Sequence, residues 1–133
     1  MTETSVWPTL RAHDASTLID FLVEGFGFTT VAVYGEGDQI GHAELAWPRG
    51  GGIMLGSARD VEGDPWPQQP GTGGAYVVTD DPDALFDRAV ARGATVVTRP
   101  HDTDYGAREC ALRDPEGNLW SFGTYRGEPR PRD

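Results

Sequence analysis

The two halves of the chain carry the same order of predicted elements, and this internal repeat constrains the fold more than any other feature. In the first half, a strand-like run over Val6–Ala12 precedes a helix over Ala15–Gly25, which Asp14 caps. Three further strand-like runs follow, over Thr29–Tyr34, Ile40–Trp47 and Gly52–Ser57. The first half therefore predicts one βαβββ unit.

The second half repeats this order. A β-rich run over Ala75–Thr79 leads into a helix that Asp81 or Asp83 caps and that extends to about Arg92. The remaining strand-like runs are Thr95–Arg99, Ala107–Arg113 and Leu119–Tyr125. When the halves are laid together without gaps, Asp14 falls on Asp81 and the apolar positions of the two helices coincide.

These elements predict one α+β domain over residues 1–133, in which a sheet of eight strands carries both helices on one side. Module one covers residues 5–58, a linker rich in proline and glycine covers 59–72, and module two covers 73–126. The polar tail over 127–133 is expected to fray. The sheet face opposite the helices is left free for a ligand, a partner surface or both.

Charge and composition narrow the classes of partner. The chain has 21 acidic and 11 basic residues, a net charge of −10, and every basic residue is an arginine. This balance argues against nucleic acid and would attract a cationic small molecule, although solubility alone also explains it. No apolar run approaches the roughly 20 residues of a membrane span, and the first residues do not resemble a signal peptide. With a single cysteine, Cys110, these features predict a cytoplasmic protein.

The most specific motif lies near the end of the chain. Tyr105–Glu109 and the stretch Leu112–Phe122, which contains a predicted hairpin turn over Asp114–Asn118, resemble the closing motif of the glyoxalase/bleomycin-resistance/dioxygenase (vicinal-oxygen-chelate) superfamily. The similarity is strongest to its antibiotic-resistance and glyoxalase-like branch. Pro8–Asp14 is similar to the first strand of that family, so the resemblance covers roughly residues 5–126. It implies a cup-shaped mixed sheet and a homodimer with two clefts at or near the subunit interface.

The same resemblance locates the positions of a divalent metal site, to which the first, fourth, fifth and eighth strands each contribute one ligand. Here these positions fall on Trp7, Met54, Ala75 and Ser121. Tryptophan, methionine and alanine are not usual ligands of a hard metal ion, and one serine cannot hold an ion alone. We therefore predict no metal, no other cofactor and no standard catalytic residue.

Without metal ligands, the cleft is predicted to be an apolar pocket for a flat or amphipathic organic molecule. The candidate lining residues are Trp7, Trp47, Met54 and Trp66, whose aromatic members can stack on a planar ligand. Each tryptophan has an alternative place in the core or at a dimer interface, and Trp120 is assigned to the core.

Five polar residues are candidates for orienting the ligand: His42, Glu44, Tyr105, Arg108 and Ser121. Residues two apart on a strand share a face, so His42 and Glu44 can act as a base and its orienting carboxylate. Arg108 has an alternative role as an ion-pair partner of Glu109 or Asp104. The remaining histidines, His13 and His101, lie in predicted turns, and Cys110 is predicted to be an inert buried thiol.

Two functions remain open. The first is a metal-independent protein that sequesters an aromatic or cationic natural product or antibiotic and so confers resistance by binding. The second is a lyase, isomerase or oxygenase of secondary metabolism, in which His42, Glu44, Tyr105 or Arg108 acts at a non-standard site. A conventional metalloenzyme is possible only if the alignment of several strands with the family's metal positions is wrong.

Overall fold

The computed structural model describes residues 4–37, 39–59 and 62–131 and contains two βαβββ modules. The first module consists of β1 (Thr9–Ala12), α1 (Ala15–Phe21), the π-helical turn η1 (Leu22–Phe26), β2 (Thr29–Glu36), β3 (Gln39–Ala46) and β4 (Gly52–Ser57). The second consists of β5 (Gly74–Val78), α2 (Pro82–Ala91), β6 (Thr95–Asp102), β7 (Arg108–Arg113) and β8 (Leu119–Gly123). The predicted α+β class and the paired modules are confirmed.

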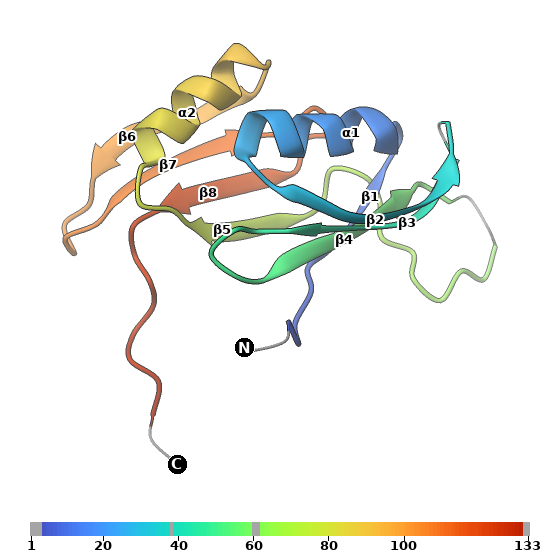
Figure 1. The fold of residues 1–133 in the computed structure, drawn as a ribbon, viewed down its shortest axis with the longest axis horizontal. Coiled ribbons are helices and arrows are strands. Elements are labelled where there is room, and N and C mark those ends of the chain that lie inside the picture. The colour runs from blue at the N-terminus through green and yellow to red at the C-terminus, as the bar shows by residue number, and fades with distance from the viewer. Residues whose placement is uncertain (1–3, 38, 60–61, 132–133) are drawn as a thin grey trace.

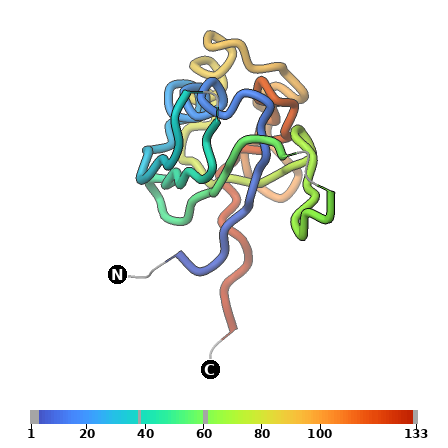
Figure 2. Tube along the Cα trace, turned by 90° about the vertical axis from the view of Figure 1, so that its right-hand side faces the viewer, coloured from blue at the N-terminus to red at the C-terminus, as the bar shows by residue number. Residues whose placement is uncertain are grey.

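The strands hydrogen-bond as two four-stranded sheets, in the orders β1-β4-β3-β2 and β5-β8-β7-β6, in place of the single eight-stranded sheet expected. In each sheet the first pair is parallel and the other pairs are antiparallel. Both helices lie on the same side of the sheets, while the chain termini leave on the other side (Figure 1). The side view in Figure 2 shows the linker between β4 and β5 extending from the body of the molecule.

Matching caps begin the two helices. The Asp14 carboxylate accepts a hydrogen bond from the Thr17 amide at 3.1 Å, and the Asp81 carboxylate accepts one from the Ala84 amide at 3.0 Å. Each cap satisfies an amide that the helix itself leaves free. The first helix ends through η1 at Gly27, whose φ of 101° is a left-handed conformation that favours glycine.

One hydrophobic core joins the two modules. Phe26 of η1 packs on two residues of β8, with ring centroids 5.4 Å from Trp120 and 4.7 Å from Phe122. The Trp47 indole N–H, at the end of β3, donates to the Val78 carbonyl oxygen of β5 at 2.9 Å. These contacts fix the position of one sheet relative to the other.

Two strand boundaries differ from the prediction. Strand β1 begins at Thr9 rather than at Val6, so Trp7 precedes the strand. Strand β6 continues to Asp102, so His101 lies in a strand and the prediction of a turn there was wrong. Strand β6 tolerates Pro100, which has no backbone N–H to donate, because β6 is an edge strand of its sheet.

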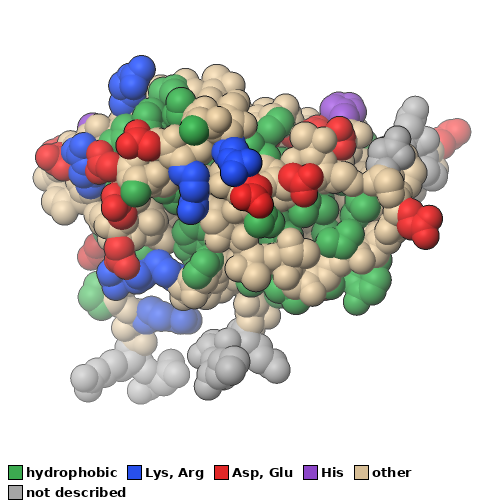
Figure 3. All heavy atoms as spheres, turned by 45° about the horizontal axis from the view of Figure 1, so that its top comes forward, with side chains coloured by type: hydrophobic (Ala, Val, Ile, Leu, Met, Phe, Trp, Pro, Cys, Tyr) green, Lys and Arg blue, Asp and Glu red, His purple; other side chains and the backbone are tan. Residues whose placement is uncertain are grey.

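The outside of the molecule carries mixed charge. On the face that bears the helices, carboxylates lie among the arginines, with hydrophobic side chains between them (Figure 3). Arg92 of α2, for example, lies 3.5 Å from Glu24 of η1. Within the described ranges, no helix combines the length and apolar character that crossing a bilayer requires.

Candidate functional site

Each sheet has one buried face and one face turned away from the helices, which we call its open face. On the first sheet, residues such as Leu10 and Leu45 are buried, and by alternation Thr9, His42 and Met54 point to the open face. On the second sheet, the buried residues are Val77, Cys110, Leu112, Trp120 and Phe122. Tyr76, Glu109 and Ser121 then belong to the open face.

A cavity of about 230 Å³ lies on the open face of the first sheet. We call it the Trp66 pocket. Met54 and His42 belong to its sheet side, and Trp66 comes from the linker. Three predicted site residues are therefore brought together here. The pocket is completed by Thr9, Leu10, Arg11, Gly41, Leu55 and Gly56.

Hydrogen bonds hold the linker side of the Trp66 pocket in place. The Gln68 amide nitrogen donates to the Thr9 carbonyl oxygen at 2.8 Å, and its amide oxygen accepts from the Trp66 indole at 3.1 Å. The Trp66 amide donates to Asp64 at 2.9 Å, and Arg59 pairs with the same carboxylate at 2.8 Å. The Arg59 hydrogen bond, followed by that of the Trp66 amide, lowers the pKa of Asp64. The aromatic wall is thus preformed without a ligand.

The predicted pairing of His42 with Glu44 is confirmed. Nε2 of His42 lies 2.9 Å from Oε2 of Glu44, and the ring of Tyr34 stacks on the imidazole at 6.1 Å between centroids. The imidazole is therefore oriented from two sides. These contacts set the direction of the imidazole at the edge of the Trp66 pocket.

A second cavity, of about 730 Å³, lies on the open face of the second sheet. We call it the tyrosine pocket, after Tyr76, Tyr105 and Tyr125. Two of these phenols donate to one carboxylate: Tyr76 to Glu109 at 3.0 Å and Tyr105 to Glu109 at 2.6 Å. Burial, and then the bond to Glu109, raises the pKa of Tyr76 to about 12. The bond to Glu109 is the main cause that raises the pKa of Tyr105.

A third cavity, of about 520 Å³, lies between the modules. Trp47 lines it, together with Phe28, Ala75 and Val78. The structure therefore does not bring Trp47 together with Trp66 and Met54. The indole of Trp47 connects the two sheets and packs against the core. This agrees with the alternative prediction that Trp47 is a packing residue.

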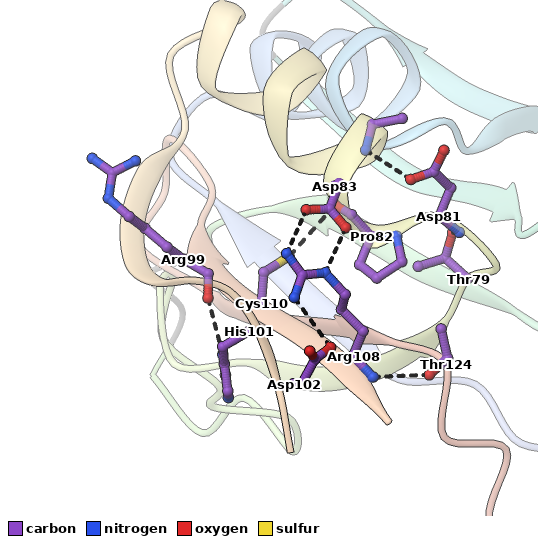
Figure 4. A network of polar contacts seen from close by, with 11 residues as sticks. Thr79, Asp81, Pro82, Asp83, Arg99, His101, Asp102, Arg108, Cys110 and Thr124 are labelled. Carbon is purple, nitrogen blue, oxygen red and sulfur yellow. Dashed lines mark hydrogen bonds and ion pairs between the residues drawn. The ribbon is translucent and has the colours of Figure 1, made fainter. Parts of the chain in front are cut away.

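Arg108 points away from both open-face pockets. Its guanidinium binds Asp83 of α2 through two bonds, of 2.8 and 2.9 Å, and Asp102 of β6 at 3.1 Å (Figure 4). The expected partners Glu109 and Asp104 were wrong, because alternation along β7 sends Arg108 and Glu109 to opposite faces. The bonds from Asp83 and then Asp102 raise the pKa of Arg108. We assign this network to holding α2 against β6 and β7.

Trp7, Ser121 and Cys110 were also predicted from the sequence, and each lies outside the three cavities described above. The Trp7 ring lies against Gly52, where an added Cβ would come within 2.8 Å of the indole. The Ser121 hydroxyl donates to the Cys110 carbonyl oxygen at 3.4 Å. Cys110 itself is buried as predicted, and burial is the main cause that raises the pKa of its thiol to about 11.

The four metal positions do not supply a suitable set of donors. Met54 and Ser121 lie on open faces and Trp7 precedes β1, whereas Ala75 packs against the core, next to the open-face position of Tyr76. Throughout the described part of the chain, no three His, Cys, Asp or Glu side chains gather as a metal site requires. The residues present therefore do not fit the divalent ion that the fold family implies.

Sequence reasoning missed part of the second pocket. The sequence does not single out Tyr76 and Tyr125 as site residues, and it places Glu109 only near Tyr105 and Arg108 at the start of a predicted strand. The three tyrosines come from β5, the β6–β7 turn and the segment after β8, so no local spacing relates them. Alternation along β7 was the one available signal, since it separates Glu109 from Cys110.

Comparison with known proteins identifies relatives over almost the whole chain. The family model described as "Glyoxalase/Bleomycin resistance protein/Dioxygenase superfamily" matches residues 4–122. A Mycobacterium tuberculosis protein described as uncharacterized is 34% identical, over 91% of this chain and 74% of its own. The crystal structure of TioX from Micromonospora is similar with a TM-score of 0.76 and 28% identity, over 92% of this chain and 98% of TioX. Lactoylglutathione lyase from Agrobacterium tumefaciens shares the fold, with a TM-score of 0.66 and 21% identity over 92% of this chain and 94% of its own.

Proposed function

Because this chain belongs to the glyoxalase/bleomycin resistance protein/dioxygenase superfamily, we propose that it sequesters an aromatic or cationic natural product, such as an antibiotic, without a metal. Members of this superfamily commonly bind small molecules. The observation that carries the proposal is the Trp66 pocket, whose aromatic wall is fixed by Gln68 and Asp64 before any ligand is present. A preformed wall reduces the entropy lost on binding, which is what a sequestering protein needs.

The lining of the Trp66 pocket supports a planar ligand. Trp66 is 54% exposed although it is held by hydrogen bonds, so its ring is free to stack on a bound molecule. Met54 offers a soft apolar contact that adapts to the shape of a ligand. Sequestration requires affinity alone, so the unsuitable residues at the metal positions do not count against it.

One observation favours the second candidate, an enzyme of secondary metabolism with a non-standard site. The hydrogen bond between His42 and Glu44 gives a proton acceptor an orienting carboxylate at the edge of the pocket. If His42 acts as a base, the protein will convert its ligand without added metal, and His42→Ala will abolish that turnover. A sequestering protein instead releases the ligand unchanged.

We further propose that the protein acts as a homodimer and that it does so in the cytoplasm. Dimers are common in this superfamily. Strands β2 and β6 are edges of their sheets and carry exposed apolar residues, among them Val31, Val33 and Val97. Light scattering after size exclusion should give twice the chain mass of 14.4 kDa. Elution at the mass of one chain, at micromolar concentration, would contradict the dimer.

The binding proposal is tested by tryptophan fluorescence. Chelator-treated protein is titrated with metal-free bleomycin, enediyne-type and other aromatic antibiotics. We expect saturable quenching at about one ligand per chain, as stacking on Trp66 predicts. Trp66→Phe should lose most of this response, whereas the control Trp47→Phe should keep it, since Trp47 lines a different cavity. Absence of quenching with every compound would oppose the proposal.

A further inference from the structure

The carboxylate of Glu109 has an unusual set of partners on the open face of the second sheet. Both hydrogen bonds recorded for it come from phenols, Tyr76 and Tyr105, which carry no charge at neutral pH. Neither neighbouring arginine pairs with it: Arg108 binds Asp83 on the opposite face, and Arg126, which lines the same pocket, binds Asp80 at 2.8 Å. The phenols therefore orient the charge of Glu109 without neutralising it.

Three aromatic rings stand around this charge. The Tyr125 ring meets that of Tyr76 at 80° with centroids 6.5 Å apart, and that of Tyr105 at 76° with centroids 5.7 Å apart. The Tyr125 amide also donates to the Tyr76 hydroxyl at 3.1 Å, which links the segment after β8 to β5. All three rings are at least 37% exposed and line the same cavity. Rings set at steep angles can present their faces to one central group.

The backbone leaves space for this cluster at Gly123. A Cβ built on Gly123 would collide with the Tyr76 hydroxyl and come within 2.6 Å of Cγ of Glu109. Its backbone carries no positive φ, so the requirement for glycine here is one of space rather than conformation. The contact of Tyr76 with Glu109 therefore depends on a residue without a side chain.

We propose that the tyrosine pocket binds the ammonium group of an organic cation, a quaternary or protonated alkylamine, between Glu109 and the rings of Tyr76, Tyr105 and Tyr125. The negative faces of aromatic rings attract such a cation, and the carboxylate supplies the counter-charge. The high pKa of Tyr76 keeps this phenol a donor to Glu109 across the neutral range. The net charge of −10 adds long-range attraction. The cation site rests on the proposed function, because it names the class of ligand that the open face of the second sheet binds.

The test uses two probes of equal shape and different charge, choline and its neutral analogue 3,3-dimethylbutan-1-ol. The reporter is the Tyr125 amide resonance in a ¹⁵N-labelled sample at constant low ionic strength, because that N–H donates to Tyr76 within the pocket. We expect a saturable shift with choline and binding at least about tenfold weaker for the neutral analogue. Equal binding of the two probes, or no shift with choline, would overturn the inference.

Matched variants separate the pocket from the overall charge. Glu109→Gln removes the charge at nearly the same shape and keeps one of the two oxygen acceptors that the tyrosines use. It should weaken choline binding about tenfold, with little effect on the analogue. Asp87→Asn makes the same change of charge at an exposed position of α2 and should change choline binding less than about twofold. Tyr105→Leu should weaken it about threefold by removing one ring. Equal effects of Glu109→Gln and Asp87→Asn would assign the attraction to net charge and overturn the site.

The two proposals fail in different ways. If an antibiotic quenches Trp66 while choline leaves the Tyr125 amide unmoved, the cation site is overturned and sequestration stands. If choline shifts Tyr125 but every antibiotic leaves Trp66 unquenched, the cation site stands and the Trp66 pocket loses its role.

Discussion

Asp114 lies in the turn between β7 and β8, where its side chain satisfies several donors at once. It is only 3% exposed, and its carboxylate accepts bonds from the Glu116 amide at 2.9 Å, the Asn118 side chain at 3.0 Å and the Trp120 indole at 2.9 Å. The sequence predicted this turn because Pro115 and Gly117 are local signals. It could not predict the bond to Trp120, which depends on packing in the core.

Asp114→Ala should therefore lower the free energy of unfolding by about 3 kcal/mol, because buried donors on Asn118 and Trp120 lose their acceptor. Urea denaturation measures the change. The control Asp104→Ala, at an exposed turn position, should stay within about 0.5 kcal/mol of the parent protein. A similar loss in both variants would contradict this account of the turn.

Tyr76 provides a prediction on pH. Its pKa in the folded protein, about 12, lies above the value of 10 for a free phenol, so the folded state favours the neutral form. The resulting stabilisation is fully present below pH 10 and should be lost as the pH rises through about 12. Absorbance at the phenolate band should show one tyrosine ionising late, and Glu109→Gln should lower its pKa. An unchanged pKa in that variant would contradict the role given to Glu109.

Local patterns predicted the roles of other residues correctly because those contacts join residues that are close in the sequence. Asp14 and Asp81 cap helices that begin directly after them. Arg108 was assigned wrong partners: Asp83 is 25 residues away on α2, and Asp102 lies opposite Arg108 on the neighbouring strand β6. Likewise, Ala75 was placed one position away from the open face, since a short apolar run does not reveal its register.

At the scale of elements, the linker is the segment that most shapes the candidate site. Its composition predicted an irregular connection, and within its described residues it forms neither helix nor strand. What the sequence did not reveal is its attachment to β1, because Gln68 bonds to Thr9 across 59 residues. That attachment makes the linker a fixed wall of the Trp66 pocket.

Gln68→Ala should weaken binding of an aromatic ligand about fivefold, because Trp66 loses its bond and must be ordered by the ligand. The free energy of unfolding should fall by less than about 1 kcal/mol, since the bonds are only partly buried. The neighbouring Gln69→Ala is the control, because the side chain of Gln69 makes one long bond, of 3.4 Å to the Pro67 carbonyl oxygen. Titration of both variants by fluorescence tests this, and equal affinities would mean that the wall does not need Gln68.

For the whole molecule, the repeat predicted the modules but not the way they join. Phe26 and Phe28 of the first module pack on Trp120 of the second, so the two halves share one core. Apolar positions in the sequence indicate burial, but they do not indicate which residues will be in contact when more than 90 positions separate them, as here. The same limit applies to the tyrosine pocket, which takes its residues from separate parts of module two.

Because the core is shared, Phe26→Ala should lower the free energy of unfolding by about 3 to 5 kcal/mol while the protein still unfolds in one transition. Val90→Ala, a change at a 40% exposed site on α2, should cost less than about 1 kcal/mol. Calorimetry and circular dichroism together would follow the unfolding. Two separate transitions in the Phe26 variant would show that the modules are stable independently.

The most direct test of the central claim, binding without metal and without chemistry, is equilibrium dialysis of the chelator-treated protein against a cationic aromatic antibiotic. Mass spectrometry then identifies the recovered compound. We predict about one molecule bound per chain, recovered with unchanged mass, and the same affinity when divalent ions are added. Binding that requires a stoichiometric metal ion, or a compound recovered with altered mass, would contradict the claim.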